Sequence, residues 1–210
     1  MTLDPQKAES DLAFMRALVA DDGSHNRSFG YVYLMAGLIY GVQCFLNWGL
    51  LVTDAQASPL VWLLIGWGPT FIFLILIFQN SWKHRENPYG NGTVKRAVGA
   101  AFSGAGIANA VLAVIFGWVA FQKKDWSIWL LFPVVVCALQ GAVWFAAAML
   151  RRHLWYGLTA LGWFVAAIIL GLVIDDIPNY VLILSIVLFI CMALPGFLIL
   201  RSATQKTATL

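Results

Sequence analysis

The stretch AQASPLVWLLIGWGPTFIFLILIFQNSW, residues 55–82, decides the fold because its 28 residues include no Asp, Glu, Lys or Arg. A membrane-spanning helix needs about 20 consecutive, mostly apolar residues, so this stretch is long enough for one span and too short for two. Lipid offers no hydrogen-bond partner to an unpaired backbone amide, and these residues do not alternate in polarity as barrel strands do. The stretch therefore predicts one transmembrane helix.

Five further charge-free stretches, of 22 to 26 residues each, follow the same pattern. Of the 210 residues in the chain, 61% are apolar and 11% are charged, against about 45–50% and about 25% in soluble domains. This composition excludes a soluble enzyme and a nucleic-acid-binding protein. The fold class is therefore an all-α polytopic membrane protein, with six transmembrane helices expected near residues 29–52, 58–80, 97–121, 128–150, 154–174 and 179–200.

Basic residues divide the loops into two unequal sets. Eleven Lys and Arg fall in the N-terminal segment, the 82–96 loop, the 151–153 turn and the C-terminal tail, whereas the opposite loops hold only Lys123 and Lys124. Because basic residues concentrate on the cytoplasmic side, we expect both termini in the cytoplasm and the chain in the inner (plasma) membrane. The expected organisation is a cytoplasmic segment at 1–27, a transmembrane domain at 28–201 and a cytoplasmic tail at 202–210.

The N-terminal segment predicts a cytoplasmic amphipathic helix. Asp4 and Pro5 are typical of helix N-termini, and apolar residues follow at helical spacing: Leu12, Phe14, Met15 and Leu18. The acidic residues of the segment outnumber its basic ones, whereas helices that lie on lipid usually carry a basic polar face. Three interpretations remain open: this helix packs on the protein itself, on a partner protein or on lipid.

The 82–96 loop is the longest interhelical connection, and basic residues flank its turn-rich centre: Lys83, Arg85, Lys95 and Arg96. One interpretation is a cytoplasmic docking face, shared with the N-terminal helix, for a partner protein or for anionic phospholipid headgroups. The other is that these residues only set the orientation of the chain.

Polar side chains inside the predicted spans are all uncharged. The candidates for a mid-membrane polar site are Tyr40, Gln43, Asn47, Thr70, Asn109 and Gln140. Side chains of this kind join helices through hydrogen bonds worth about 0.6 kcal/mol each. Alternatively, they line a small cavity that binds a neutral or amphipathic molecule. Since ion and proton paths normally use an ionisable residue within the membrane, the sequence argues against ion-coupled transport.

The residues that redox, metal and hydrolytic chemistry need are not grouped in this sequence. The three histidines fall at the edges of spans, and the three cysteines fall in three different spans. Haem needs facing axial ligands and zinc needs a tetrahedral ligand set, and Ser103 has no base predicted at its depth. We therefore expect no catalytic residue, no metal and no cofactor.

Two patterns concern helix packing. The second and fourth spans open with similar tetrapeptides, VWLL at 61–64 and IWLL at 128–131, which suggests three parallel hairpin repeats, although interfacial Trp is common in any membrane hairpin. Small residues let helices approach closely. They recur at Gly37 and Gly41 and throughout 97–108, so we expect the third span at the centre of the bundle, with a homo-oligomer interface as the alternative.

Three tryptophans, Trp67, Trp144 and Trp163, lie deeper than the interfacial aromatic belt and predict either core packing or an aromatic-lined pocket. Taken together, the sequence favours a non-catalytic membrane protein that acts as an accessory, sensor or assembly partner. The alternative is a carrier or binder of a small neutral or amphipathic molecule. The expected partners are membrane phospholipids, a protein on the cytoplasmic side or further copies of the chain, but not nucleic acid.

Overall fold

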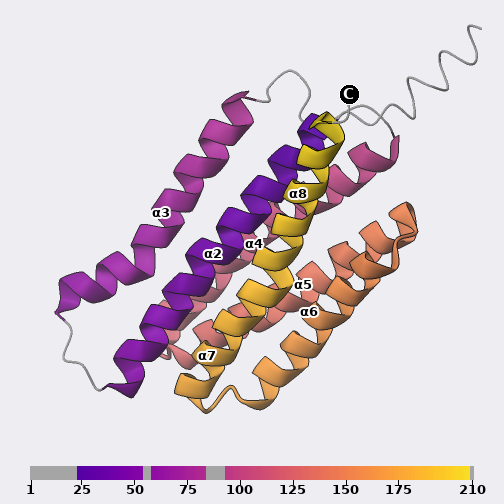
Figure 1. Cartoon of the computed structure of the whole chain (residues 1–210). Helices are drawn as coiled ribbons and strands as arrows, with labels where there is room; N and C mark the ends of the chain where they lie inside the picture. Colours follow the sequence, from indigo (N-terminus) through magenta and orange to yellow (C-terminus); the bar gives the residue numbers. More distant parts are fainter. Residues whose placement is uncertain (1–22, 54–57, 84–92, 209–210) are drawn as a thin grey trace, which may run out of the picture.

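The computed structural model describes residues 23–53, 58–83 and 93–208, and these residues form helices and short connections without a strand (Figure 1). The first five spans are α2 (Gly23–Val52), α3 (Pro59–Lys83), α4 (Thr93–Lys123), α5 (Ser127–Arg151) and α6 (Leu154–Leu172). The sixth comprises α7 (Ile177–Val187), the π-helical segment η1 (Leu188–Ala193) and α8 (Leu194–Ala208). Within these described residues, six helices are long and apolar enough to cross a membrane, which confirms the predicted all-α, six-span class. The predicted N-terminal amphipathic helix lies outside the described residues.

Local polar contacts set where two helices begin on the side opposite the termini. The Asp176 carboxylate accepts hydrogen bonds from the Asn179 backbone amide at 3.3 Å and from its side chain at 2.7 Å, which caps α7. Asp125 accepts from both the amide and the hydroxyl of Ser127, at 3.0 and 2.6 Å. These two bonds hold the pKa of the Asp125 carboxyl below its usual range, because they favour the charged form.

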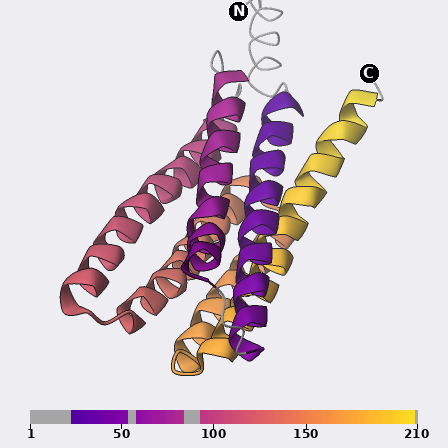
Figure 2. The same cartoon turned by 90° about the vertical axis from the view of Figure 1, so that its left-hand side faces the viewer.

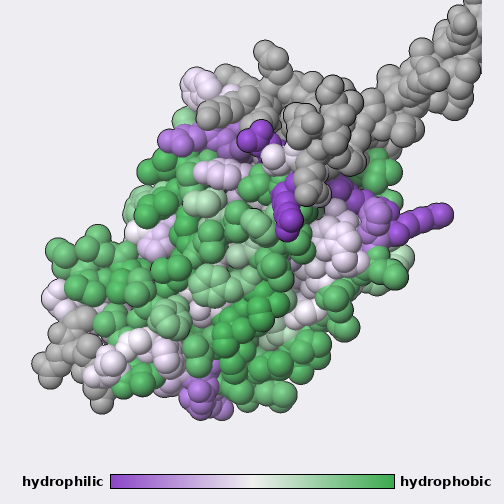
Figure 3. Space-filling view, viewed as in Figure 1, coloured by the Kyte–Doolittle hydropathy of each residue, from purple (hydrophilic) through white to green (hydrophobic). Residues whose placement is uncertain are grey.

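The outer surface is apolar across the middle of the molecule, and hydrophilic side chains gather towards its two ends (Figure 3). The start of α2 and the end of α8 lie at the same end (Figures 1 and 2). Arg27, Arg96, Arg152 and Arg201 lie at that end and are exposed. An apolar band between two polar ends is the surface that a lipid bilayer requires.

The helix α2 lies at the centre of the arrangement, between α3 on one side and α7, η1 and α8 on the other. A Cβ built on Gly37 would lie 2.8 Å from the Cα of Ala193, and one built on Gly196 would lie 2.7 Å from the Cα of Leu34. Glycine is required at these positions because the two backbones touch. The expected close packing of the first span through its small residues is therefore confirmed, and its partner is the sixth span.

The helix α4 does not occupy the centre, contrary to the sequence-based expectation. Only 11% of its membrane window is buried, against 33% for the sixth span. A Cβ on Gly104 or Gly106 would meet nothing within 4 Å. The physical reason is that α4 packs mainly on α5 through its larger side chains, among them Phe102 and Phe116. Its small residues therefore lie largely on the outer side.

The predicted hairpin repeat is not shown by the structure. In a threefold arrangement the second, fourth and sixth spans would have equivalent surroundings. Instead α3 packs on α2 alone among the main helix contacts and buries none of its membrane window, whereas α5 packs on both α4 and α6. The sixth span also differs from the other two because a π-helical turn precedes Pro195. A π-helical turn is a local departure from α-helical geometry. Pro195 has no backbone N–H with which to continue the α-helical hydrogen bonds of the preceding turn.

Candidate functional site

The interface between α2 and α3 contains the first group of predicted polar residues. The Gln43 side-chain amide donates a hydrogen bond of 3.0 Å to the backbone carbonyl of Gly66, and the ring of Tyr40 packs edge-on against Phe73 with centroids 5.4 Å apart. Thr70 and Asn47 are half-buried. The role of Gln43 is therefore to join two helices.

The bond from Gln43 has a specific local cause. Gly66 lies three residues before Pro69, which has no N–H and bends α3 (Figure 1). A proline inside a helix disturbs the hydrogen bonds of the preceding turn. In a membrane the carbonyls that this disturbance exposes must find donors on neighbouring helices. Pro69 removes the donor to the Ile65 carbonyl, and the adjoining Gly66 carbonyl in the same disturbed turn receives a donor from Gln43.

The same arrangement recurs at Pro133, which lies inside α5. Leu130 lies three residues before Pro133 in α5, and its carbonyl accepts a hydrogen bond of 2.6 Å from the Tyr180 hydroxyl of α7. The Ser185 hydroxyl likewise donates to the carbonyl of Gly41 at 2.9 Å. Neither Tyr180 nor Ser185 was among the residues predicted from the sequence. The signal that could have found the first of these contacts is the proline, since it marks carbonyls upstream that need a donor.

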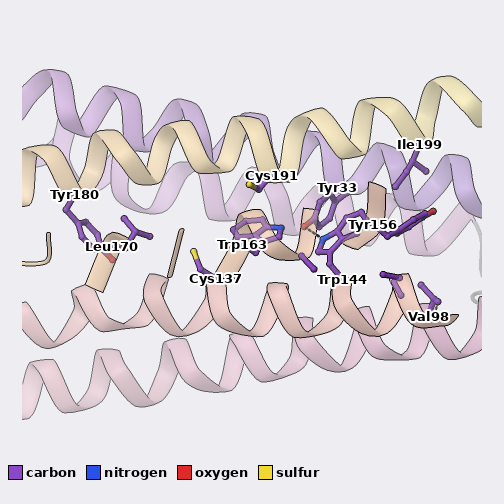
Figure 4. Packing of buried hydrophobic residues seen from close by; sticks show 13 residues of the cluster. Tyr33, Val98, Cys137, Trp144, Tyr156, Trp163, Leu170, Tyr180, Cys191 and Ile199 are labelled. Atoms are coloured by element: carbon purple, nitrogen blue, oxygen red, sulfur yellow. Dashed lines mark hydrogen bonds between the residues drawn. The ribbon is translucent and has the colours of Figure 1, made fainter. Parts of the chain in front are cut away.

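An aromatic cluster fills the core between α2, α5 and α6, and Figure 4 shows it from close by. The indole nitrogen of Trp144 donates a hydrogen bond of 2.6 Å to the Tyr33 hydroxyl, and Phe102 from α4 packs against both rings. Trp144 and Trp163 are fully buried, whereas Trp67 is 63% exposed on α3. Two of the three tryptophans that were predicted to lie deep in the membrane are therefore core residues, in agreement with the core-packing interpretation.

The remaining two predicted residues, Asn109 and Gln140, belong to the α4–α5 side of the molecule. Their amide oxygens are buried and have no hydrogen-bond partner among the described residues. The six candidates thus fall into two groups on different helix pairs, with Tyr40, Gln43, Asn47 and Thr70 in the other group.

Little of the predicted cytoplasmic docking face falls within the described residues. Arg96 is exposed near the start of α4, Lys95 lies beside it in the first turn, and Lys83 ends α3. Arg85 and the apolar residues of the N-terminal helix (Leu12, Phe14, Met15 and Leu18) lie outside the described residues. The Arg151 guanidinium at the end of α5 donates to the Tyr156 hydroxyl at 2.8 Å and lies 5.4 Å from the centroid of its ring. This contact fixes the α5–α6 corner on the basic end.

The described residues contain no group of three or more His, Cys, Asp or Glu that could hold a metal ion. The three cysteines are free thiols on three different helices. Comparison of the chain with protein-family models, with curated proteins and with solved structures finds no match.

Proposed function

We propose that this integral membrane protein is a non-catalytic accessory or assembly partner of another membrane protein. The observation that carries the proposal is the use of polar side chains within the spans. Gln43, Tyr180 and Ser185 all donate to backbone carbonyls of neighbouring helices. Polar groups that are used in hydrogen bonds between helices hold a defined set of helix contacts. A protein whose role depends on its shape requires such a defined set.

The outer side of α4 is the surface that we assign to the partner. Ser103, Gly106 and Ala110 lie along this side at alternating spacings of three and four residues, and all three are exposed. Membrane-helix interfaces are enriched in small residues because these let two backbones come close. The partner that fits this surface is therefore a transmembrane helix of a second protein.

We propose that the protein lies in the inner or plasma membrane, with both ends of the described chain on the cytoplasmic side. The exposed arginines at the end where α2 starts and α8 finishes support this orientation through the positive-inside rule. Asp125, Asp175 and Asp176 lie at the opposite end. Reporter fusions after residue 208 and within the 124–126 turn test it, and a cytoplasmic signal from the 124–126 fusion would contradict it.

The accessory role is tested by purification from its native membrane into lipid nanodiscs, followed by native mass spectrometry. We expect a stoichiometric second membrane protein that is retained by Gly171→Leu and lost with Gly106→Leu. The two variants are matched because both glycines are exposed and a Cβ at either one meets nothing within 4 Å. A bare chain, a second copy alone, or a partner unaffected by Gly106→Leu would overturn the proposal.

A second candidate function is the binding of a small neutral or amphipathic molecule within the membrane. The observation that favours it is the pair of buried amide oxygens, on Asn109 and Gln140, that lack hydrogen-bond partners. A discrete small mass retained by the purified chain and lost with Gln140→Leu would support this candidate. A purified chain without any added mass would exclude it.

A further inference from the structure

The turn between α4 and α5 contains a pocket on the surface of the molecule. Its volume is about 420 Å³, and Phe121, Gln122, Lys124 and Trp126 line it. Ligand pockets in proteins have volumes of about 300–1,000 Å³, so this pocket can hold a small polar group. Its lining combines two aromatic rings, an amide and one ammonium group, which suits an anion that is attached to an apolar body.

The pocket lies at the level of the lipid headgroups. The membrane window of α4 runs from Arg96 to Lys123 and contains 28 residues, which span about 42 Å at the rise of an α-helix. A bilayer measures about 30 Å across its hydrocarbon core and about 40–45 Å with its headgroup regions. The turn that follows α4 therefore lies outside the hydrocarbon core, and Figure 2 shows it at the end of the molecule opposite the C-terminus.

The backbone of Lys124 adopts a conformation that glycine adopts more readily, with a φ angle of 52°. Its amide donates to the Phe121 carbonyl at 3.3 Å, and the Asp125 amide donates to the Ala120 carbonyl at 3.1 Å. These two bonds form a Schellman motif, in which the left-handed residue is usually glycine because a Cβ is crowded there. A lysine at this position therefore needs a reason.

The positive-inside rule does not supply that reason. Among the described residues, the other non-glycine residue with a positive φ is Arg152. Arg152 lies at the basic end of the molecule, where the rule accounts for its charge. Lys124 lies at the opposite end, where the loops hold no basic residues in the sequence except Lys123 and Lys124. The charge of Lys124 is therefore not explained by the orientation of the chain.

The neighbouring carboxylate does not neutralise the pocket. Asp125 accepts hydrogen bonds from the amide and the hydroxyl of Ser127, which lower the pKa of its carboxyl, and the charge of Lys123 lowers this pKa further. Asp125 is thus paired with Ser127 and attracted to Lys123. None of the described residues that line the pocket carries a carboxylate. The pocket therefore presents the single positive charge of Lys124.

We propose that this pocket binds the headgroup of an anionic phospholipid from the leaflet at this end of the molecule. The Lys124 ammonium donates to the phosphate oxygens. The rings of Phe121 and Trp126 contact the apolar part of the same lipid next to its phosphate, at the depth where interfacial aromatic residues lie. An anionic headgroup fits better than a zwitterionic one, because no lining carboxylate pairs with a headgroup ammonium.

Binding of phosphatidylglycerol to the purified full chain in detergent, measured by native mass spectrometry, tests the proposal. We expect Lys124→Gly to weaken binding of the first lipid molecule about fivefold, which is the usual effect of one basic residue at an anionic lipid surface. The matched control is Arg152→Gly, which should retain the wild-type affinity. Both substitutions remove an exposed basic side chain and place glycine at a positive φ, where glycine is favoured, so both variants should fold.

A second pair of variants tests the aromatic lining. Trp126 and Trp67 are 65% and 63% exposed, but Trp126 lines the pocket whereas Trp67 lies on α3. Trp126→Leu should weaken binding of the same lipid, and Trp67→Leu should leave it unchanged. Equal effects of these two substitutions would show that the aromatic part of the pocket does not contact the lipid and would overturn the proposal.

Three further outcomes would overturn it. The first is the absence of bound phosphatidylglycerol, or equal binding of phosphatidylcholine with the same acyl chains. The second is equal weakening by Lys124→Gly and Arg152→Gly, which would indicate unspecific charge attraction. The third is binding of glycerol 3-phosphate with the affinity of the lipid, which would identify a soluble phosphate as the ligand. The measurement uses the single purified chain, so its result is independent of whether a partner protein exists.

Discussion

The substitution Gly37→Ala tests the packing that holds the molecule together. The added Cβ would lie 2.8 Å from the Cα of Ala193, whereas ordinary van der Waals contacts begin at 3.4 Å. The obstructing atoms belong to the backbone, so one helix must shift by several tenths of an ångström along its whole contact. Overpacking of this kind costs about 1–3 kcal/mol. Alanine recovers about 1 kcal/mol through its higher helix propensity.

We therefore expect the free energy of unfolding of Gly37→Ala to change by between about zero and a loss of about 2 kcal/mol. The matched control is Gly104→Ala, because a Cβ there meets nothing within 4 Å. This control should gain about 0.5–1 kcal/mol. Steric trapping in bicelles measures both values on the same scale. If the two substitutions change stability in the same direction and by the same amount, the assignment of the close contact between α2 and the sixth span at η1 is wrong.

Three further predictions concern the interior contacts. Tyr180→Phe removes the donor to the Leu130 carbonyl and should lower the free energy of unfolding by about 1 kcal/mol. Tyr31→Phe, on an exposed side chain, should leave the free energy of unfolding unchanged. Equal effects of the two substitutions would show that the Tyr180 hydrogen bond does not stabilise the fold. Gln43→Leu should cost about 0.6–2 kcal/mol through loss of the bond to Gly66. Pro69→Ala should reduce that cost in a double-mutant cycle, because a regular helix pairs the Gly66 carbonyl with the Thr70 amide; independent effects would refute this coupling. A membrane-permeant maleimide should label Cys44, which is half-buried, faster than Cys137 and Cys191, which are buried; mass spectrometry over time measures the rates, and equal rates would contradict the described core.

The class of protein could be predicted from the sequence because the bilayer imposes a strict condition. A charge-free stretch of about 20 residues must become a helix, since every backbone group has to be paired within it. The six observed helices accordingly start and end within a few residues of the predicted limits, apart from extensions such as α8, which reaches Ala208. The π-helical segment was not predicted, because a proline alone does not tell which local departure the chain will adopt.

The polar contacts could be predicted only in part. Gln43 stood out because a buried amide needs partners, but its acceptor is a backbone carbonyl, which no residue type marks. Tyr180 and Ser185 were missed for the same reason, since each donates to a carbonyl of a distant segment, Leu130 and Gly41 respectively. Gln140 is buried and Asn109 is half-buried, and the structure places them on a different helix pair from Gln43.

The sequence by itself determined that the chain spans a membrane with six helices, because hydropathy and helix length act locally along the chain. Only the tertiary structure decided which helix lies at the centre. Gly37 and Gly104 are the same residue in similar helices, and close approach is open to both. The first touches the backbone of Ala193 and the second faces away from the protein, because the neighbour of a helix face is chosen by the packing of the whole bundle.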